Sequence, residues 1–276
     1  MNLNERLNTI SVSVIIGILL VYVFSFLDWT LSILAFFSII PLYFFVQKNY
    51  ARYEFLNKIW HLDGAWRYGF PFALYLVIGN IVQIVFIGYD AYHLYIAYAL
   101  RTIIVAFILL QFRSLYRELA DFKLDGIAIF AGAVIFVLWI GLEGYYPMLF
   151  SANNHFDPSI FNANLMIILL IIRFIGSVFV APFIEELFTR SFLIRYAISP
   201  KWMDVPIGTY TFGSFAIVTL FFGLLHYRWL PGILTAIILN LLLYKRRNIF
   251  SCIQAHATAN LFLFIYVVYT KTWYFW

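Results

Sequence analysis

Residues 162–184 read NANLMIILLIIRFIGSVFVAPFI, and Glu185-Glu186-Leu-Phe-Thr-Arg190 follows directly. The first part is an apolar run long enough to cross a bilayer, which takes about 20 residues. The second part places two carboxylates and a guanidinium at the end of that run. Because ionisable side chains at membrane depth carry a large cost in solvation free energy, this stretch indicates both a membrane helix and a functional site.

The composition of the whole chain is that of a polytopic membrane protein. Of its 276 residues 64% are hydrophobic and 11% are charged, against about 25% charged in a soluble domain. Continuous apolar runs favour helices over barrel strands, which would alternate. We therefore predict an all-α transmembrane bundle of eight to nine spans in a single transmembrane domain, residues 1–276. The predicted spans are 10–27, 29–46, 70–89, 92–112, 125–142, 162–184, 209–226, 229–244 and 249–268.

The positive charges follow a membrane topology. Lys and Arg gather in 47–69, in 113–124, in 245–248 and in the loop predicted after residue 184, whereas 144–161 contains none. The positive-inside rule then predicts a cytoplasmic N-terminus, with the C-terminus outside for nine spans and inside for eight. This arrangement explains the net charge of +5 without a nucleic-acid partner. Cys252 is the only cysteine, so we expect a packing residue and no intramolecular disulfide or Cys-rich metal site.

The first polar motif can separate the roles of its two carboxylates. On a helix Glu186 and Arg190 share a face, while Glu185 lies about 100° around the axis. A nearby cation favours the charged form of a carboxylate and burial disfavours it, so the two neighbours can differ in charge and in role. The alternative is a solvated ion pair in a cytoplasmic loop, without function.

Two further motifs have the same four-residue spacing. In Phe222-x3-His226 the aromatic ring can orient the imidazole and exclude water, and in His256-x3-Asn260 an imidazole and an amide can together donate to one oxyanion. Taken alone, the first is more typical of a core histidine, and the second of a hydrogen-bonded pair between helices. The three motifs in this order indicate a hydrolytic site.

The residues Glu185-Glu186-x3-Arg190, Phe222-x3-His226 and His256-x3-Asn260 resemble the CAAX-protease and bacteriocin-processing (CPBP, or Abi) family of intramembrane proteases, whose relatives include the CAAX prenyl endopeptidases. The resemblance covers residues 162–268, which would be the catalytic core helices, after the N-terminal helices of 1–160. Thr189-Arg190-Ser191 departs from the Phe-Arg-Gly of many members. The segment Trp139 to Pro147 is faintly similar to the exosortase-associated subgroup.

The resemblance implies an intramembrane glutamic-type endopeptidase. Glu185 would be the general base that activates a water, aided by His226, and His256 with Asn260 would stabilise the oxyanion. Glu186, Arg190 and Phe222 would support the site. The implied substrate is a membrane-anchored protein or peptide, the implied location is a bacterial inner (plasma) membrane, and we expect no metal, cofactor or nucleic acid.

Two alternatives stay open at the level of the sequence. One is a zinc-dependent variant, because a glutamate and two histidines could bind zinc with an open fourth position, although His-Glu-x-x-His is absent. The other is a transporter or scaffold whose polar residues line a pathway or tie helices together. A transporter would favour paired repeats or broken spans in both halves, and the sequence shows neither.

The predicted topology itself separates two of the proposed site residues. It places Glu185 at the inner end of one span and His226 at the outer end of the next, about 27 Å apart for 18 residues at about 1.5 Å per residue. Because Pro182 can kink or restart a helix, we expect Glu185 to lie deeper, with 186–197 continuing as a partly buried helix.

Overall fold

The computed structural model describes residues 64–85, 93–148 and 155–276. The predicted spans 10–27 and 29–46 lie outside the described residues. The chain forms two compact units, Met1–Leu115 and Tyr116–Trp276. Within the described ranges every regular element is helical and no strand occurs, which confirms the all-α prediction for this part of the chain.

The described part of the first unit is a pair of packed helices. These are α5 (Ala65–Val85) and α6 (His93–Phe112), and a 3-10 turn, Arg113–Leu115, follows α6. Ile78 and Val82 of α5 pack against Ala97 of α6. The predicted spans 70–89 and 92–112 correspond to these two helices.

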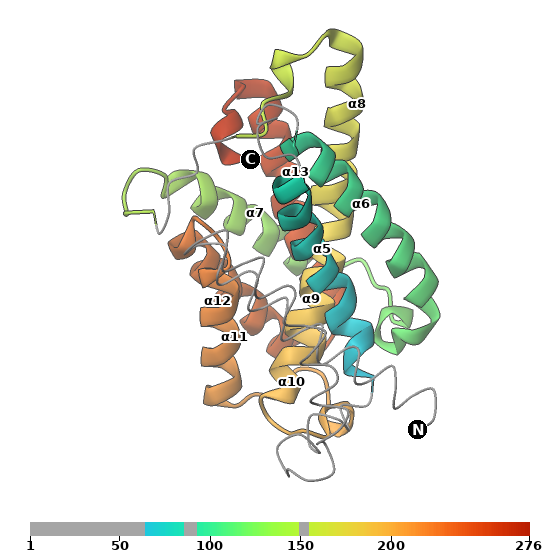
Figure 1. The fold of residues 1–276 in the computed structure, drawn as a ribbon. Helices are drawn as coiled ribbons and strands as arrows, with labels where there is room; N and C mark the ends of the chain where they lie inside the picture. The colour runs from blue at the N-terminus through green and yellow to red at the C-terminus, as the bar shows by residue number, and fades with distance from the viewer. Residues whose placement is uncertain (1–63, 86–92, 149–154) are drawn as a thin grey trace. The chain divides into compact units, whose positions relative to one another are not determined.

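The second unit contains all three motifs. Its helices of four turns or more are α7 (Gly126–Gly141), α12 (Trp229–Arg246) and α13 (Ile249–Thr270), and the shorter α8 (Ala163–Phe174) and α11 (Phe212–Leu224) complete the main frame. The helix α13 packs against α7, α9 and α12, and α11 packs against α12 (Figure 1). Because α13 contacts both α7 and α9, the residues on its buried face can meet side chains from either helix.

Side-chain caps fix where these helices begin. Asp125 accepts a hydrogen bond from the backbone N–H of Ile127 at the start of α7, and Asn162 does the same for α8. Thr211 caps α11 and Asn248 caps α13. Each cap satisfies one of the backbone N–H groups that have no partner in the first turn of a helix.

The run that begins with α8 does not end at residue 184 as predicted. It continues through a π-helical turn (Ile175–Val180), α9 (Ala181–Glu186), a second π-helical turn (Leu187–Leu193) and α10 (Ile194–Tyr196), and these follow one another along one line in Figure 1. Pro182 has no N–H and its ring crowds the preceding turn. The wider π turn just before it, in which Ala181 N–H bonds to Gly176 O, accommodates the proline.

This continuation corrects the predicted cytoplasmic loop after residue 184. The apolar run spans 34 residues, Ala163–Tyr196, or about 50 Å of helix, which exceeds the roughly 30 Å hydrocarbon core. Arg190 and Arg195 lie within it and are buried. The expectation that 186–197 continues as a partly buried helix is thereby confirmed as far as Tyr196.

Three helices in the described residues are long and apolar enough to cross a membrane. They are Leu94–Leu115, Ala163–Tyr196 and Ile249–Thr270, while α7 and α11 are shorter apolar helices. These helices make the chain an integral membrane protein, but the predicted count of eight to nine spans is not confirmed.

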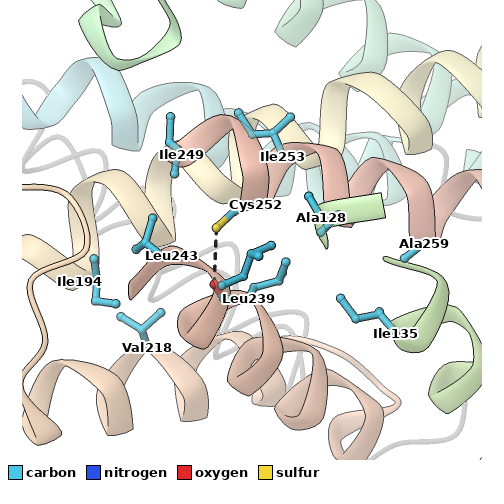
Figure 2. Packing of buried hydrophobic residues seen from close by; sticks show 12 residues of the cluster. Ala128, Ile135, Ile194, Val218, Leu239, Leu243, Ile249, Cys252, Ile253 and Ala259 are labelled. Carbon is cyan, nitrogen blue, oxygen red and sulfur yellow. Dashed lines mark hydrogen bonds between the residues drawn. The ribbon is translucent and has the colours of Figure 1, made fainter. Parts of the chain in front are cut away.

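The core of the second unit lies between α7, α12 and α13 (Figure 2). Leu239 and Leu243 of α12 pack there with Ile249, Cys252 and Ile253 of α13, all of them buried. The thiol of Cys252 donates to the carbonyl of Leu239, with 3.4 Å between sulfur and oxygen. Cys252 is therefore a packing residue, as predicted.

Two helix contacts depend on the absence of a side chain. A Cβ atom on Gly132 of α7 would lie 2.3 Å from the carbonyl oxygen of Ala255 in α13. A Cβ on Gly223 of α11 would lie 2.3 Å from a side-chain carbon of Ile233 in α12. Small residues of this kind allow close packing between membrane helices.

We predict that Gly132→Ala destabilises the protein by about 1–3 kcal/mol, because the methyl group forces α7 and α13 apart. Gly141→Ala is the matched control on the same helix, since a Cβ there meets no atom within 4 Å. Thermal unfolding in detergent measures both variants. Equal unfolding temperatures for Gly132→Ala and Gly141→Ala would contradict the close α7–α13 contact.

Candidate active site

The predicted site residues come from three neighbouring parts of the second unit. Glu185 and Glu186 are the last two residues of α9, and Arg190 follows in the second π-helical turn. Phe222 lies in α11, with His226 just beyond its end. His256 and Asn260 lie on α13.

Glu186 and Arg190 form a buried ion pair. Arg190 Nη1 donates to Glu186 Oε1 across 3.2 Å, and both side chains are 0% exposed. The guanidinium carbon of Arg190 also lies 4.3 Å from the centre of the Phe222 ring, in cation–π contact. The predicted pairing of Glu186 with Arg190 is therefore present in the structure, in the core rather than in a solvated loop.

His256 lies between the two carboxylates. Its Nδ1 is 2.9 Å from Glu186 Oε1 and its Nε2 is 3.9 Å from Glu185 Oε2. Because the carboxylate of Glu186 is already bound to Arg190, it accepts the Nδ1 proton, which fixes the ring and leaves Nε2 facing Glu185. The Glu185 side chain is 18% exposed, against 0% for Glu186. The two adjacent glutamates thus occupy different surroundings.

Phe222 brings His226 to the same group of residues. Its ring centre is 4.8 Å from that of His226 and 6.0 Å from that of His256. His226 Nδ1 lies 2.8 Å from the carbonyl oxygen of Phe222. A carbonyl can only accept, so Nδ1 carries the proton and Nε2 is the free ring nitrogen. Phe222 contacts both histidines, and His256 Nε2 lies 3.9 Å from Glu185 Oε2. His226 and Glu185 are therefore closer together than the distance of about 27 Å in the predicted topology.

Asn260 is oriented by a backbone group. It lies one turn after His256, and its Nδ2 donates to the carbonyl of Ser177 across 2.7 Å. Ser177 is in the first π-helical turn. One amide hydrogen of Asn260 is thus committed to Ser177, and the second is the one that it can offer to a ligand.

Two buried residues outside the motifs complete the surroundings of Arg190. Arg190 Nε donates to Asn240 Oδ1 across 3.3 Å, and Asn240 Nδ2 donates to Thr219 Oγ1 across 3.1 Å. The sequence prediction did not include either residue. The signal available for Asn240 was an amide in the middle of the apolar stretch 229–244, where a polar side chain needs a partner.

The residues that depart from the family pattern take part in these contacts. Thr189 Oγ1 accepts from Arg190 Nη1 at 2.8 Å and donates to the carbonyl of Glu185 at 2.5 Å. Ser191 hydrogen-bonds to Glu118 and accepts from Arg195 Nη2. The Thr189 hydroxyl therefore connects Arg190 to the main chain of Glu185.

The segment that follows α7 lies beside His226. The ring of Trp139 meets that of His226 edge to face, with 5.5 Å between centres. Glu143 forms a bidentate ion pair with Arg228 at 2.7 and 2.8 Å. This pair links the end of α7 to the residue before α12, two positions after His226. The likeness of this segment to the exosortase-associated subgroup stays a prediction.

The zinc-dependent alternative requires carboxylates and imidazoles that can share one metal ion. In the described parts of the chain no three His, Cys, Asp or Glu side chains form a group that could hold a metal ion. Glu186 Oε1 already accepts from both Arg190 and His256, and a guanidinium at that oxygen would repel a divalent cation.

Comparison with known proteins agrees with the resemblance. Residues 167–262 match the family model described as type II CAAX prenyl endopeptidase Rce1-like. The match extends from α8 into α13 and includes every motif residue from Glu185 to Asn260. No curated protein and no solved structure matches the chain significantly.

The family match favours an enzyme over the transporter or scaffold that the sequence left open. Its residues coincide with the helices that bring the two glutamates, the arginine and the two histidines together. Over residues 167–262 the chain is similar to the Rce1-like CAAX prenyl endopeptidases, and this match indicates a membrane protease.

Proposed function

We propose that the protein is a glutamic-type intramembrane endopeptidase in which Glu185 is the general base. The observation that carries this proposal is the difference between the two adjacent carboxylates. Glu186 is buried against Arg190 and His256, whereas Glu185 is partly exposed and, among the described residues, has only His256 Nε2 as an ion-pair partner at 3.9 Å. A base must reach water and substrate, and Glu185 is the carboxylate that can.

The steps that we propose for hydrolysis use these positions. Glu185, aided by His226, takes a proton from water as the water oxygen bonds to the scissile carbonyl carbon. Asn260 donates its second amide hydrogen to the resulting oxyanion. Because Nδ1 of His256 already donates to Glu186, that ring donates from Nε2 when it carries both protons. The proton held by Glu185 then passes to the leaving nitrogen as the carbon–nitrogen bond breaks.

The substrate that we propose is a membrane-anchored protein or peptide. The three long apolar helices of the described residues and the family match support a reaction next to lipid. Cleavage of fluorescent anchored peptides by the purified full chain in lipid vesicles tests this class of substrate. Prenylated and unprenylated versions of the same peptide distinguish the two kinds of anchor.

We predict that Glu185→Gln lowers turnover by at least about 10²- to 10⁴-fold with an unchanged unfolding temperature, because the amide keeps the shape but cannot accept the proton. Glu186→Gln should instead lower stability by about 3–5 kcal/mol, because the buried Arg190 loses its counter-charge. Arg190→Gln should resemble Glu186→Gln. Turnover and thermal unfolding of the variants measure both effects.

Asp204→Asn is the control for a charge lost elsewhere in the second unit, because Asp204 is exposed and outside the site. It should retain turnover and stability. Full activity of Glu185→Gln would end the assignment of the base, and a Glu186→Gln variant as stable as wild type would end the supporting role of the ion pair.

We predict that cleavage persists in EDTA and in phenanthroline. The reason is that the sequence lacks the His-Glu-x-x-His helix of a metalloprotease and has an asparagine, Asn260, as the fourth polar residue of the motifs. A known zinc protease in the same vesicles is the positive control for chelation. Activity that is lost with chelator and restored by zinc would establish the zinc-dependent variant instead.

We propose that the protein lies in a bacterial inner membrane with residues 113–124 and 245–248 in the cytoplasm. Lys245, Arg246 and Arg247 lie at the C-terminal end of α12, and Trp229 at its other end donates to the carbonyl of Pro147. The helix has 18 residues and is about 27 Å long. The basic residues and Trp229 therefore lie at opposite ends of it.

In cells that express a variant without Cys252, a membrane-impermeant thiol reagent should label Tyr145→Cys from outside and should not label Lys245→Cys until the membrane is opened. Both expectations follow from the gathering of Lys and Arg on the cytoplasmic side. Labelling of Lys245→Cys in intact cells, with Tyr145→Cys protected, would reverse the orientation.

A further inference from the structure

Arg190 is held from outside its own helix by a chain of two buried polar residues. Its Nε donates to Asn240 Oδ1 on α12 across 3.3 Å, and Asn240 Nδ2 donates to Thr219 Oγ1 on α11 across 3.1 Å. Arg190 and Asn240 are 0% exposed, and Thr219 is 6% exposed. Both hydrogen bonds lie wholly inside the protein, where hydrogen bonds are strong and the loss of a partner costs free energy.

The chemistry of the partners fixes the orientation of the amide. A guanidinium N–H can only donate, so the Asn240 atom that faces Arg190 must be the oxygen. The Asn240 nitrogen then faces Thr219, whose hydroxyl oxygen accepts. Reversing the amide would place two donors against each other at Arg190, so only one orientation satisfies both contacts.

Asn240 connects Arg190 to helices other than its own. Thr189 also binds Arg190, but it is the neighbouring residue and moves with the same turn. Asn240 connects Arg190 to α12 and, through Thr219, to α11. Thr219 lies one turn before Phe222, which contacts Arg190, His226 and His256. The amide therefore aligns the helix of the two glutamates with α11, the helix that precedes His226.

We propose that Asn240 is a positioning residue of the active site, which acts through Arg190 on Glu186 and His256. The amide fixes the plane of the guanidinium, Arg190 Nη1 fixes Glu186 Oε1, and Glu186 fixes the Nδ1 edge of His256. His256 Nε2 thereby keeps its direction toward Glu185. This inference rests on the proposed function, because it assigns Asn240 to the same site.

Asn240→Leu removes both hydrogen bonds while nearly keeping the volume of the side chain. We expect kcat to fall by about 10- to 100-fold with KM unchanged, because misplaced catalytic groups slow the chemical step without touching the substrate. Asn240→Asp should restore most of the activity, since it keeps an oxygen for Arg190 and the Thr219 hydroxyl can turn to donate to the other oxygen. Thr219→Val should cause a smaller loss in the same direction.

Ser251→Ala is the control for the loss of a buried hydrogen bond. Ser251 is 4% exposed and donates to Asp125 Oδ2 across 2.7 Å, away from the carboxylates of the site. It should lose stability while kcat stays at the wild-type value.

A measurement on His256 separates positioning from general stability. In the full chain labelled with ¹⁵N-histidine, the proton on His256 Nδ1 should give a resonance that is absent from His256→Gln. We expect this resonance to shift or to broaden beyond detection in Asn240→Leu and Thr219→Val, and to persist in Ser251→Ala. Where Asn240→Leu fails to fold, Thr219→Val decides the result.

An unchanged His256 resonance in Asn240→Leu would overturn the proposal, whatever happened to kcat. Equal losses of kcat in Asn240→Leu and Ser251→Ala would overturn it as well. A resonance that responds to Asn240→Leu, in a protein whose wild-type activity does not depend on Glu185, would support the positioning role and reject the proposed mechanism.

Discussion

The buried ion pair of Glu186 and Arg190 is the constraint on which the site depends. Two opposite charges with no exposed surface are stable only if their geometry and remaining hydrogen bonds are good. Arg190 meets this condition in part, because it donates to Glu186, Thr189 and Asn240 and lies 4.3 Å from the centre of the Phe222 ring. Arg190 Nη2 and Glu186 Oε2 are buried without a hydrogen-bond partner among the described residues. The contacts of Arg190 involve residues of the second π-helical turn, α11 and α12. The charge pair is therefore satisfied only when these elements pack together. His256 completes the arrangement from α13.

The helix that carries the two carboxylates contains π-helical turns on either side of α9. Pro182 would break a regular α-helix within the membrane, but the π-helical turns on either side of α9 keep the chain helical from Ala163 to Tyr196. Wider turns also change which residues face a neighbouring helix and which carbonyls are open to side chains, and they occur often at functional sites. The Ser177 carbonyl, which accepts from Asn260, lies in the first of these turns, and Arg190 lies in the second.

Sequence reasoning predicted the contacts that depend on spacing along one helix. The Glu186–Arg190 pair and the contact between Phe222 and His226 follow from a separation of four residues, and the structure has both. The predicted loop after residue 184 was wrong. Charged residues in an apolar run indicate the end of a span unless their buried partners are known. Asn240 and Thr219 were not found for a related reason: they are 21 residues apart, and only the packing of α11 on α12 brings them together.

A polar site within an apolar helical bundle is subject to one further requirement. A buried polar group without a partner costs free energy, since lipid and hydrocarbon side chains supply no hydrogen bonds. In this site Glu186, Arg190, Asn240 and Thr219 hydrogen-bond to one another, although Glu186 Oε2 and Arg190 Nη2 are buried without a hydrogen-bond partner among the described residues. His226 and His256 each have one ring nitrogen committed to an acceptor. Glu185 and the free Nε2 atoms of the two histidines remain for an incoming water and a peptide carbonyl. The hydrogen bonds that hold the buried groups in place therefore leave these atoms free to react, and the same contacts that stabilise the fold determine where we propose that hydrolysis occurs.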